Sequence, residues 1–403
     1  MGVSAPVSNR RITWLAFLMD FGIGIVMLAL PLLVMYRGGS AFQMGMIGLL
    51  HRLPCVLGCA VFGPFSDRIG RRRSILISCI CLIVLYLLMG FCTSLVLTFF
   101  LVGGIGFANA LFWPAVQAWM GDLYQGDTNQ IIVTVGRYNL KWSVGQLLGN
   151  LLAGSLLRVG LGIPFVVSGI FAVMIALLAK NLPEVQVAEL AQEEEDLRKD
   201  KDQRILHYVG YAQLANFCAW LALGMIVSIF PRIAAQRLLL TSVGTSLMIG
   251  CIGVARTACF VFLSKHHFWH YETLPLIKAT LLGAIVFLLA FLLPVSLPIS
   301  ILALTSLGMI IALTYTNCVV YNISLSQDRG KATGFNEVIQ LGGYCVGALL
   351  AGIGGSSTVV GLPYLIISIV FACGTLGLIR SLRVDERDYE ADEPMDQARH
   401  TFS

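Results

Sequence analysis

The chain has 403 residues, of which 57% are hydrophobic and 12% are charged. An ordinary water-soluble chain carries roughly a quarter charged residues, so this composition excludes that class and predicts an all-α protein that crosses a membrane many times. The formal net charge of +5 is spread over many loops instead of one basic face, so it does not indicate a nucleic-acid partner, and none is expected.

Twelve apolar runs follow one another along the chain, and each can cross the hydrocarbon core, which needs about 20 residues. They lie near residues 12–36, 44–66, 74–92, 95–121, 130–157, 162–180, 207–233, 241–264, 274–293, 297–324, 332–355 and 361–381. The charged stretch 181–206 predicts a cytoplasmic linker between two six-helix bundles, residues 1–180 and 207–383. The acidic tail, residues 384–403, is expected to be disordered.

The distribution of Lys and Arg predicts the orientation, because these residues gather in cytoplasmic loops. With both termini cytoplasmic, the segments on that side hold 18 of the 27 basic residues and the external loops hold four. We therefore expect an integral, multi-pass protein with both ends inside, in a bacterial plasma (inner) membrane.

The loop between the second and third runs reads Gly63-Pro64-Phe65-Ser66-Asp67-Arg68-Ile69-Gly70-Arg71-Arg72-Arg73. It resembles the signature loop of the major facilitator superfamily of membrane transporters, which has Gly, Asp, Arg, Gly, Arg and Arg at its first, fifth, sixth, eighth, ninth and tenth positions. All six are matched, and Phe65 departs from the small aliphatic residue usual in the family. The alternative is a generic basic turn that holds the loop in the cytoplasm.

The resemblance implies two six-helix bundles related by a pseudo-two-fold axis around a central cavity. It also implies that the loop latches the two halves together on the cytoplasmic side, and that its arginines pair with an acid at the end of the fourth span. Asp122 stands at that place in this sequence. The predicted gating residues are Gly63, Asp67, Arg68, Gly70, Arg71, Arg72 and Asp122.

An internal repeat supports the division into halves. A shift of 198 residues places Gly145 and Gly149 on Gly343 and Gly347, and a shift of 200 places Gly24 on Gly224. The second copy of the signature loop has decayed to residues 263–270, which include three histidines. An interfacial loop is favoured there over a metal site, because no carboxylate or cysteine stands beside the histidines.

Charged residues deep in the apolar runs predict a functional site, because such residues are costly in a membrane. The acids are Asp20 and Glu337, and the bases are Arg52, Arg137, Lys141 and Arg256. The resemblance implies that all six lie on spans that line the cavity. Their positive sum favours an anionic solute, and Asp20, Glu337 and His51 are the candidate proton carriers. A static ion pair is the alternative for Arg137 and Lys141 with Asp20.

Uncharged polar residues recur at helical spacing on three of the predicted cavity spans. These are Asn109, Trp113 and Gln117; Gln213, Asn216 and Trp220; and Asn317 and Tyr321. Hydrogen bonds between helices would explain any one set, whereas three sets together favour a binding site.

We interpret the chain as a secondary transporter that moves a small organic solute by alternating access, with protons as the candidate coupling ion. An exporter of amphipathic drugs is the alternative within this class. An enzyme is not expected, because no catalytic or metal motif is apparent, and a non-transporting sensor would bring a soluble signalling domain. We expect a monomer in contact with membrane lipid, with no cofactor and no metal; the eleven cysteines form no Cys-x-x-Cys pair.

Overall fold

The computed structural model describes residues 5–123, 128–181, 203–266, 268–269, 272–325, 329–357, 359 and 361–400. Within these ranges the secondary structure is entirely helical. The helices are α1 (Ala5–Tyr36), α2 (Ala41–Ile69), α3 (Arg71–Phe91), α4 (Leu95–Asn109), α5 (Trp113–Leu123), α6 (Thr128–Val159), α7 (Ile163–Ala179), α8 (Gln203–Gln236), α9 (Ser242–Leu263), α10 (Thr273–Leu292), α11 (Leu297–Leu325), α12 (Arg329–Gly355) and α13 (Leu362–His400).

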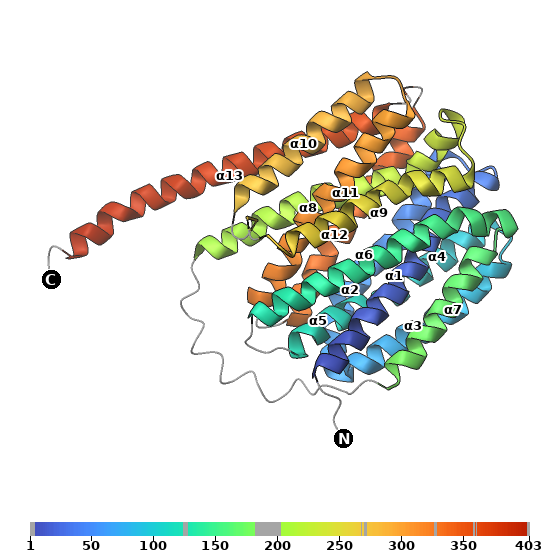
Figure 1. The fold of residues 1–403 in the computed structure, drawn as a ribbon, viewed down its shortest axis with the longest axis horizontal. Coiled ribbons are helices and arrows are strands. Elements are labelled where there is room, and N and C mark those ends of the chain that lie inside the picture. Colours follow the sequence, from blue (N-terminus) through green and yellow to red (C-terminus); the bar gives the residue numbers. More distant parts are fainter. Residues whose placement is uncertain are drawn as a thin grey trace.

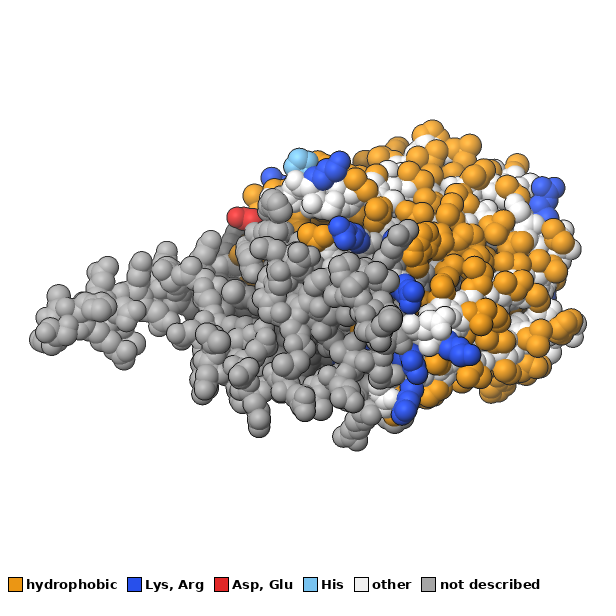
Figure 2. All heavy atoms as spheres, turned by 60° about the horizontal axis from the view of Figure 1, so that its bottom comes forward, with side chains coloured by type: hydrophobic (Ala, Val, Ile, Leu, Met, Phe, Trp, Pro, Cys, Tyr) orange, Lys and Arg blue, Asp and Glu red, His pale blue; other side chains and the backbone are white. Residues whose placement is uncertain are grey.

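The helices match the twelve predicted spans, with α4 and α5 sharing the fourth. Among the described residues, nine helical segments are long and apolar enough to cross a membrane by length and composition, and Ile163–Ala179 is a shorter apolar helix. The helices that fall outside these two groups are α2 and α6, which carry Arg52, Arg137 and Lys141. A wide belt of hydrophobic side chains covers the surface in Figure 2, with Lys and Arg side chains along its edges. The chain is therefore built as an integral, multi-pass membrane protein.

Figure 1 shows the blue-to-green helices α1–α7 on one side of the molecule and α8–α13, yellow-green to red, on the other. The helix pairs α2–α12 and α6–α9 join these two bundles. We call the end that carries residues 37–40, 160–162 and 237–241 the outer end, and the end that carries Gly70 and residues 264–266 the inner end. These names follow the orientation predicted from the Lys and Arg residues.

The fourth span is broken into two helices, where the sequence predicted one. Pro114 has no amide hydrogen to donate to the carbonyl of Ala110, and the α-helix is interrupted at residues 110–112. The carbonyl groups freed there are satisfied by α3: Ser78 Oγ donates to Ala108 O and Ser74 Oγ to Leu111 O, both at 2.7 Å. After the break, α5 begins at Trp113, which lines the central pocket described below.

The internal repeat predicted from the glycines appears as two equivalent helix crossings. On α6, a Cβ at Gly145 would collide with the carbonyl of Phe17 on α1. On α12, a Cβ at Gly343 would collide with the carbonyl of Phe217 on α8. Small residues let backbones approach closely in a membrane, so the same device holds α1 to α6 and α8 to α12.

Two close crossings seal the two bundles together at the outer end. Gly45 of α2 lies against Gly352 of α12 with no room for a side chain between them. On the other pair, Ser246 Oγ of α9 accepts from Gly154 N of α6 at 2.9 Å, and Ser242 Oγ donates to Gly154 O at 3.1 Å. The outer end is therefore closed by backbone contacts, which depend on small side chains.

Helix α13 runs as far as His400 and extends beyond the bundle (Figure 1). The expected disorder of residues 384–403 stays a prediction. Residues 182–202, most of the predicted linker, lie outside the described residues.

Candidate central binding pocket

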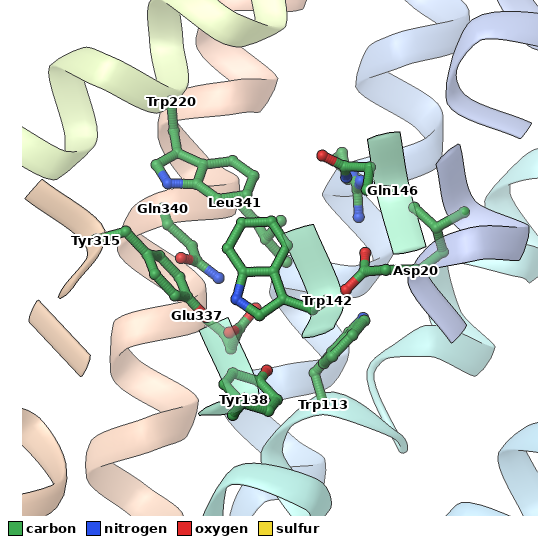
Figure 3. Close-up of a pocket in the computed structure, with 12 residues that line it drawn as sticks. Asp20, Trp113, Tyr138, Trp142, Gln146, Trp220, Tyr315, Glu337, Gln340 and Leu341 are labelled. Atoms are coloured by element: carbon green, nitrogen blue, oxygen red, sulfur yellow. The ribbon is translucent and has the colours of Figure 1, made fainter. Parts of the chain in front are cut away.

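A cavity of about 40 Å³ lies between the two bundles, halfway along the helices. Seven helices contribute to its wall, and aromatic, amide and charged side chains make up most of it (Figure 3). The lining residues are Asp20, Ile23, Arg52, Trp113, Tyr138, Trp142, Gln146, Trp220, Tyr315, Glu337, Gln340 and Leu341. One water molecule needs about 10–15 Å³ of such a cavity, so in this conformation the pocket has room for a few waters and is too small for an organic solute.

One face of α6 supplies three of these side chains. Tyr138, Trp142 and Gln146 are spaced by four residues, so they share the face that is turned to the pocket. Arg137 and Lys141 each precede one of them and point about 100° away around the helix. Arg137 is exposed, and Lys141 Nζ lies 3.7 Å from the ring centroid of Trp14 on the outside of the bundle. Both bases were expected to face the cavity, but in the structure their side chains point away from it.

The two deep acids enter the pocket from different bundles. Asp20 of α1 is 5% exposed and Glu337 of α12 is 3% exposed. Figure 3 shows Asp20 on one side of the Trp142 ring, with Glu337 and Gln340 on the other. Because each bundle contributes one carboxylate, the distance between the two carboxylates changes whenever the bundles move relative to each other.

Hydrogen bonds hold Glu337 from the side of the first bundle. Gln117 Nε2 of α5 donates to Glu337 Oε1 at 2.5 Å, and Gln340, one turn along α12, also bonds this carboxylate. Asp20 has no hydrogen bond among the described residues, although it lies within electrostatic range of Arg256, Arg52 and Glu337. Neither acid forms an ion pair within the described part of the chain. The Asp20 carboxylate is thus open to a proton or to a solute group.

The two deep arginines are held in different ways. Arg256 is 1% exposed, and it donates from Nε to Ser143 Oγ at 2.9 Å and from Nη1 to Gln146 Oε1 at 2.7 Å. Its guanidinium also lies 4.3 Å from the ring centroid of Trp142. These contacts join α9 to α6, so Arg256 is a bridge between the bundles behind the pocket wall.

Arg52 lines the pocket itself, and its hydrogen-bond donors have few good acceptors. Its Nη2 donates to Met27 Sδ at 3.0 Å, and thioether sulfur is a weak acceptor. Its Nε is buried without a hydrogen-bond partner among the described residues. A buried guanidinium with donors to spare is a site at which an anionic group would be stabilised.

Aromatic rings form the largest part of the wall. The Trp142 and Tyr315 rings meet edge to face with centroids 5.2 Å apart, and Trp220 lies 6.2 Å from Tyr315. Because Trp142 belongs to the first bundle and Tyr315 to the second, this contact also crosses the interface. Flat, rigid side chains of this kind stack well on the apolar part of a solute.

Four of the predicted site residues lie together in the pocket: Asp20, Arg52, Trp113 and Glu337. Asn317 and Asn216 instead bond between helices, with Tyr208 Oη donating to Asn317 Oδ1 at 2.7 Å and Thr314 Oγ1 donating to Asn216 Oδ1 at 3.4 Å. Asn109 is fully buried and donates to Ile105 O within its own helix. The side chain of Tyr321 lies outside the described residues.

Several pocket residues were missed from the sequence: Tyr138, Gln146, Tyr315, Gln340, Ile23, Leu341 and Trp142. The signal for three of them was available, because Tyr138, Trp142 and Gln146 repeat at four-residue intervals. The adjacent charges at 137 and 141 drew attention to the wrong face of the same helix. No group of three or more His, Cys, Asp or Glu side chains in the described residues is placed to hold a metal ion.

The predicted gating loop is described in part. Gly70 joins α2 to α3 with φ 93° and ψ 142°, a conformation that requires glycine, and Arg71 behind it is 1% exposed. The side chains of Asp67, Arg68 and Asp122, and the surroundings of Gly63, lie outside the described residues. The pairing of the arginines with Asp122 therefore stays a prediction. The role of Arg72 in a latch between the two halves also stays a prediction.

Comparisons with known proteins agree with this architecture. A family model described as Major Facilitator Superfamily matches residues 12–326. An uncharacterized MFS-type transporter YqjV of Bacillus subtilis is 26% identical over 172 residues, which cover 40% of this chain and 41% of that protein, well under half of either. Among solved structures, the human organic anion transporter MFSD10 (TETRAN) has a TM-score of 0.70 at 18% identity, over 92% of this chain and 99% of that one. The nucleoside transporter NupG has a TM-score of 0.65 at 14% identity, over 93% and 99% of the two chains.

Proposed function

Because this chain belongs to the major facilitator superfamily of membrane transporters, we propose that it moves a small organic solute by alternating access around the pocket at Asp20, Arg52 and Glu337. The two bundles would rock about this pocket, so that it opens first to one side of the membrane and then to the other. Its volume of about 40 Å³ supports this cycle, since a solute enters only if the bundles separate.

The observation that carries the proposal is a set of buried charges without ion pairs. Asp20, Glu337 and Arg52 are each 5% exposed or less, and they line one pocket between the bundles. Ionisable groups at this depth are expensive unless they are paired or used. A solute, a coupling ion or a change of conformation would supply the partners that these groups lack in the described structure.

The first candidate solute is an organic anion that carries a flat apolar part. Arg52 favours an anionic solute, because its Nε lacks a hydrogen-bond partner among the described residues and its Nη2 has only a weak acceptor. A flat apolar part is favoured because three tryptophans line the pocket: Trp113, Trp142 and Trp220. The support from total charge is smaller than the sequence predicted, since Arg137 and Lys141 lie away from the pocket and Arg256 is engaged by Ser143 and Gln146.

The second candidate is an exporter of amphipathic compounds. Its specific support is the aromatic wall together with Asp20, whose carboxylate has no hydrogen bond among the described residues and would attract a cationic group. The two candidates differ in which side chain meets the charged end of the solute. An anion would depend on Arg52, and a cation would depend on Asp20.

Protons are the proposed coupling ion, with Asp20 and Glu337 as the carriers. Each carboxylate lies at the interface of the two bundles, so its surroundings change during the cycle. His51 is a weaker candidate: it lies beside Arg52 in a smaller cavity of about 10 Å³, and its Nε2 has no partner among the described residues. We further propose a monomer without enzymatic activity, in a bacterial plasma membrane with both termini cytoplasmic. The distribution of Lys and Arg supports that orientation.

The test uses purified protein in liposomes and a panel of anionic, cationic and neutral aromatic solutes, with and without an imposed pH gradient. We expect uptake of at least one anionic aromatic solute, stimulated by the gradient and strongly weakened in Arg52→Gln. Uptake of cationic solutes alone, lost in Asp20→Asn, would favour the second candidate. Absence of transport for every class would contradict the proposal.

A further inference from the structure

A larger cavity, of about 630 Å³, lies between α9, α10 and α11, apart from the central pocket. We call it the α10 groove. Phe262 of α9 forms one wall, Leu274 and Leu282 of α10 form the other, and Met309 and Leu313 of α11 form the floor. Helices α9 and α10 both pack on α11, which leaves the space above α11 between them.

The α10 groove opens on the outside of the bundle. Phe262, Leu274, Leu282 and Met309 are all between two fifths and just over half exposed, and they belong to the apolar surface of the protein. Arg256 of α9 reaches towards α6 in the other bundle and is not among the residues that line the groove. The groove therefore faces lipid, and a solute in the central pocket would not reach it.

The length of the groove matches one leaflet of a bilayer. Helix α10 begins at Thr273 at the inner end, and Leu282 lines the groove nine residues later. At 1.5 Å per residue this depth is about 14 Å, close to half of a hydrocarbon core of about 30 Å. An acyl chain that enters from the inner end would reach the middle of the membrane along this groove.

The mouth of the groove carries one charge of each sign. Glu272 immediately precedes α10, and Lys278 lies less than two turns into it; both are exposed and line the groove. Within the described part of the chain, neither side chain forms a hydrogen bond or an ion pair, although the backbone carbonyl of Glu272 accepts from Tyr208 Oη at 3.0 Å. A lysine at this depth extends its ammonium towards the headgroup region, where it meets lipid phosphate.

We propose that the α10 groove binds one phospholipid of the inner leaflet, with an acyl chain along Met309 and Leu313 and the phosphate at Lys278. The carboxylate of Glu272 selects a headgroup that carries an ammonium, such as ethanolamine, over glycerol. This site is independent of the transported solute, and it assigns a role to an intramembrane lysine that the central pocket does not use.

The test compares binding of defined phospholipids by native mass spectrometry of the purified full-length protein. Phosphatidylethanolamine and phosphatidylglycerol are added separately to wild type, Lys278→Gln, Glu272→Gln and the groove-filling variant Ala279→Phe. Lys180→Gln is the matched control, because Lys180 is an exposed lysine at the C-terminus of α7, in the other bundle. A phosphatidylethanolamine with a photoactivatable acyl chain then locates the bound lipid by peptide mapping.

We expect wild type and Lys180→Gln to retain one phosphatidylethanolamine that crosslinks to residues 297–325. Lys278→Gln should weaken binding of both lipids by about fivefold, as expected for one basic group at a lipid surface. Glu272→Gln should weaken phosphatidylethanolamine alone, and Ala279→Phe should abolish the crosslink. Equal binding by wild type, Lys278→Gln and Ala279→Phe would overturn the proposal. So would crosslinks only elsewhere, or a groove that retains detergent but no phospholipid.

Discussion

Gln117 of α5 donates a hydrogen bond of 2.5 Å from Nε2 to Oε1 of Glu337 on α12. The two residues are 220 positions apart in the chain and belong to different bundles. This contact therefore connects the two halves beside the central pocket, and it must break if the bundles separate there. Glu337 is thus placed to respond to both the conformation of the protein and the contents of the pocket.

We predict that Gln117 and Glu337 are energetically coupled. Gln117→Ala, Glu337→Gln and the double variant form a double-mutant cycle, with the free energy of unfolding measured in mixed detergent micelles. Hydrogen bonds to charged groups contribute about 1.5–3 kcal/mol, so we expect a coupling energy of at least about 1 kcal/mol. The cycle of Gln117→Ala with Glu272→Gln is the control and should be additive. An additive result for both cycles would remove Gln117 as a partner of Glu337.

We predict that Asp20→Asn loses the response to a pH gradient but keeps solute exchange. The amide cannot take up or release a proton, although it fills nearly the same space beside Arg52. Uptake into liposomes driven by the gradient should fall at least about tenfold, a loss equivalent to 1.4 kcal/mol, while exchange of labelled for unlabelled solute persists. Arg237→Gln, which alters an exposed side chain at the outer end and away from the central pocket, should behave as wild type. Gradient-driven uptake by Asp20→Asn at the wild-type rate would exclude Asp20 as the proton carrier.

Arg52 and Lys141 should differ in their effect on solute affinity. Arg52 lines the pocket, whereas Lys141 lies over Trp14 on the outside of the bundle. We expect Arg52→Gln to raise KM for an anionic solute by about tenfold or more, and Lys141→Gln to change it less than about twofold. Initial uptake rates over a range of solute concentrations provide the measurement. The reverse order of effects would show that the solute contacts the face of α6 that carries Lys141.

The glycine crossings should be sensitive to a single methyl group. A Cβ at Gly347 would collide with the carbonyl of Leu221, whereas a Cβ at Gly342 meets nothing within 4 Å. Gly347→Ala should therefore destabilise the protein by about 1–3 kcal/mol, because α12 must move away from α8, and Gly342→Ala should have little effect or a slight stabilising one. Thermal unfolding of the two variants in the same detergent tests the difference. Equal stability would mean that the α8–α12 crossing tolerates a wider separation.

A larger residue at Gly45 should open the outer end. Gly45 lies against Gly352 across the bundle interface, so Gly45→Val would force α2 and α12 apart there. We expect faster hydrogen–deuterium exchange in residues 41–52 and 345–355, with no change in residues 212–226 of α8. Gly103→Val is the control, because a Cβ at Gly103 makes only ordinary contacts at 3.9–4.0 Å. Unchanged exchange in Gly45→Val would show that this crossing does not close the outer end.

The α6 helix shows how close sequence analysis came to the site. The resemblance to the transporter family implies that this span faces the cavity, and the span does face it, whereas Arg137 and Lys141 suggested the wrong side of the helix. The side chains that face the cavity are Tyr138, Trp142 and Gln146. In the sequence, each of the two charges stands next to a pocket residue. The sequence alone could not decide which of these two neighbouring helix faces is turned to the pocket.

Some features of this protein followed from its sequence alone. An apolar run of about 20 residues must form a helix across the membrane, because no water is present there to satisfy its backbone; this determined the twelve spans. The repeated glycines Gly145 and Gly343 indicated that the fifth and eleventh spans are counterparts, but not which helices they cross. Asp20 and Glu337, the only acids deep in the apolar runs, pointed to the pocket because burial of a charge is costly.

Tertiary structure alone decided which polar groups meet. Asn317 and Tyr208 bond between helices, Arg256 bonds Ser143 and Gln146, and Gln117 bonds Glu337, each across more than 100 positions of the chain. Such pairings depend on how helices rotate and how closely they approach. In this chain those two quantities are set by glycine contacts and by the break before Pro114, which act over the whole bundle, so the sequence around one polar residue does not identify its partner.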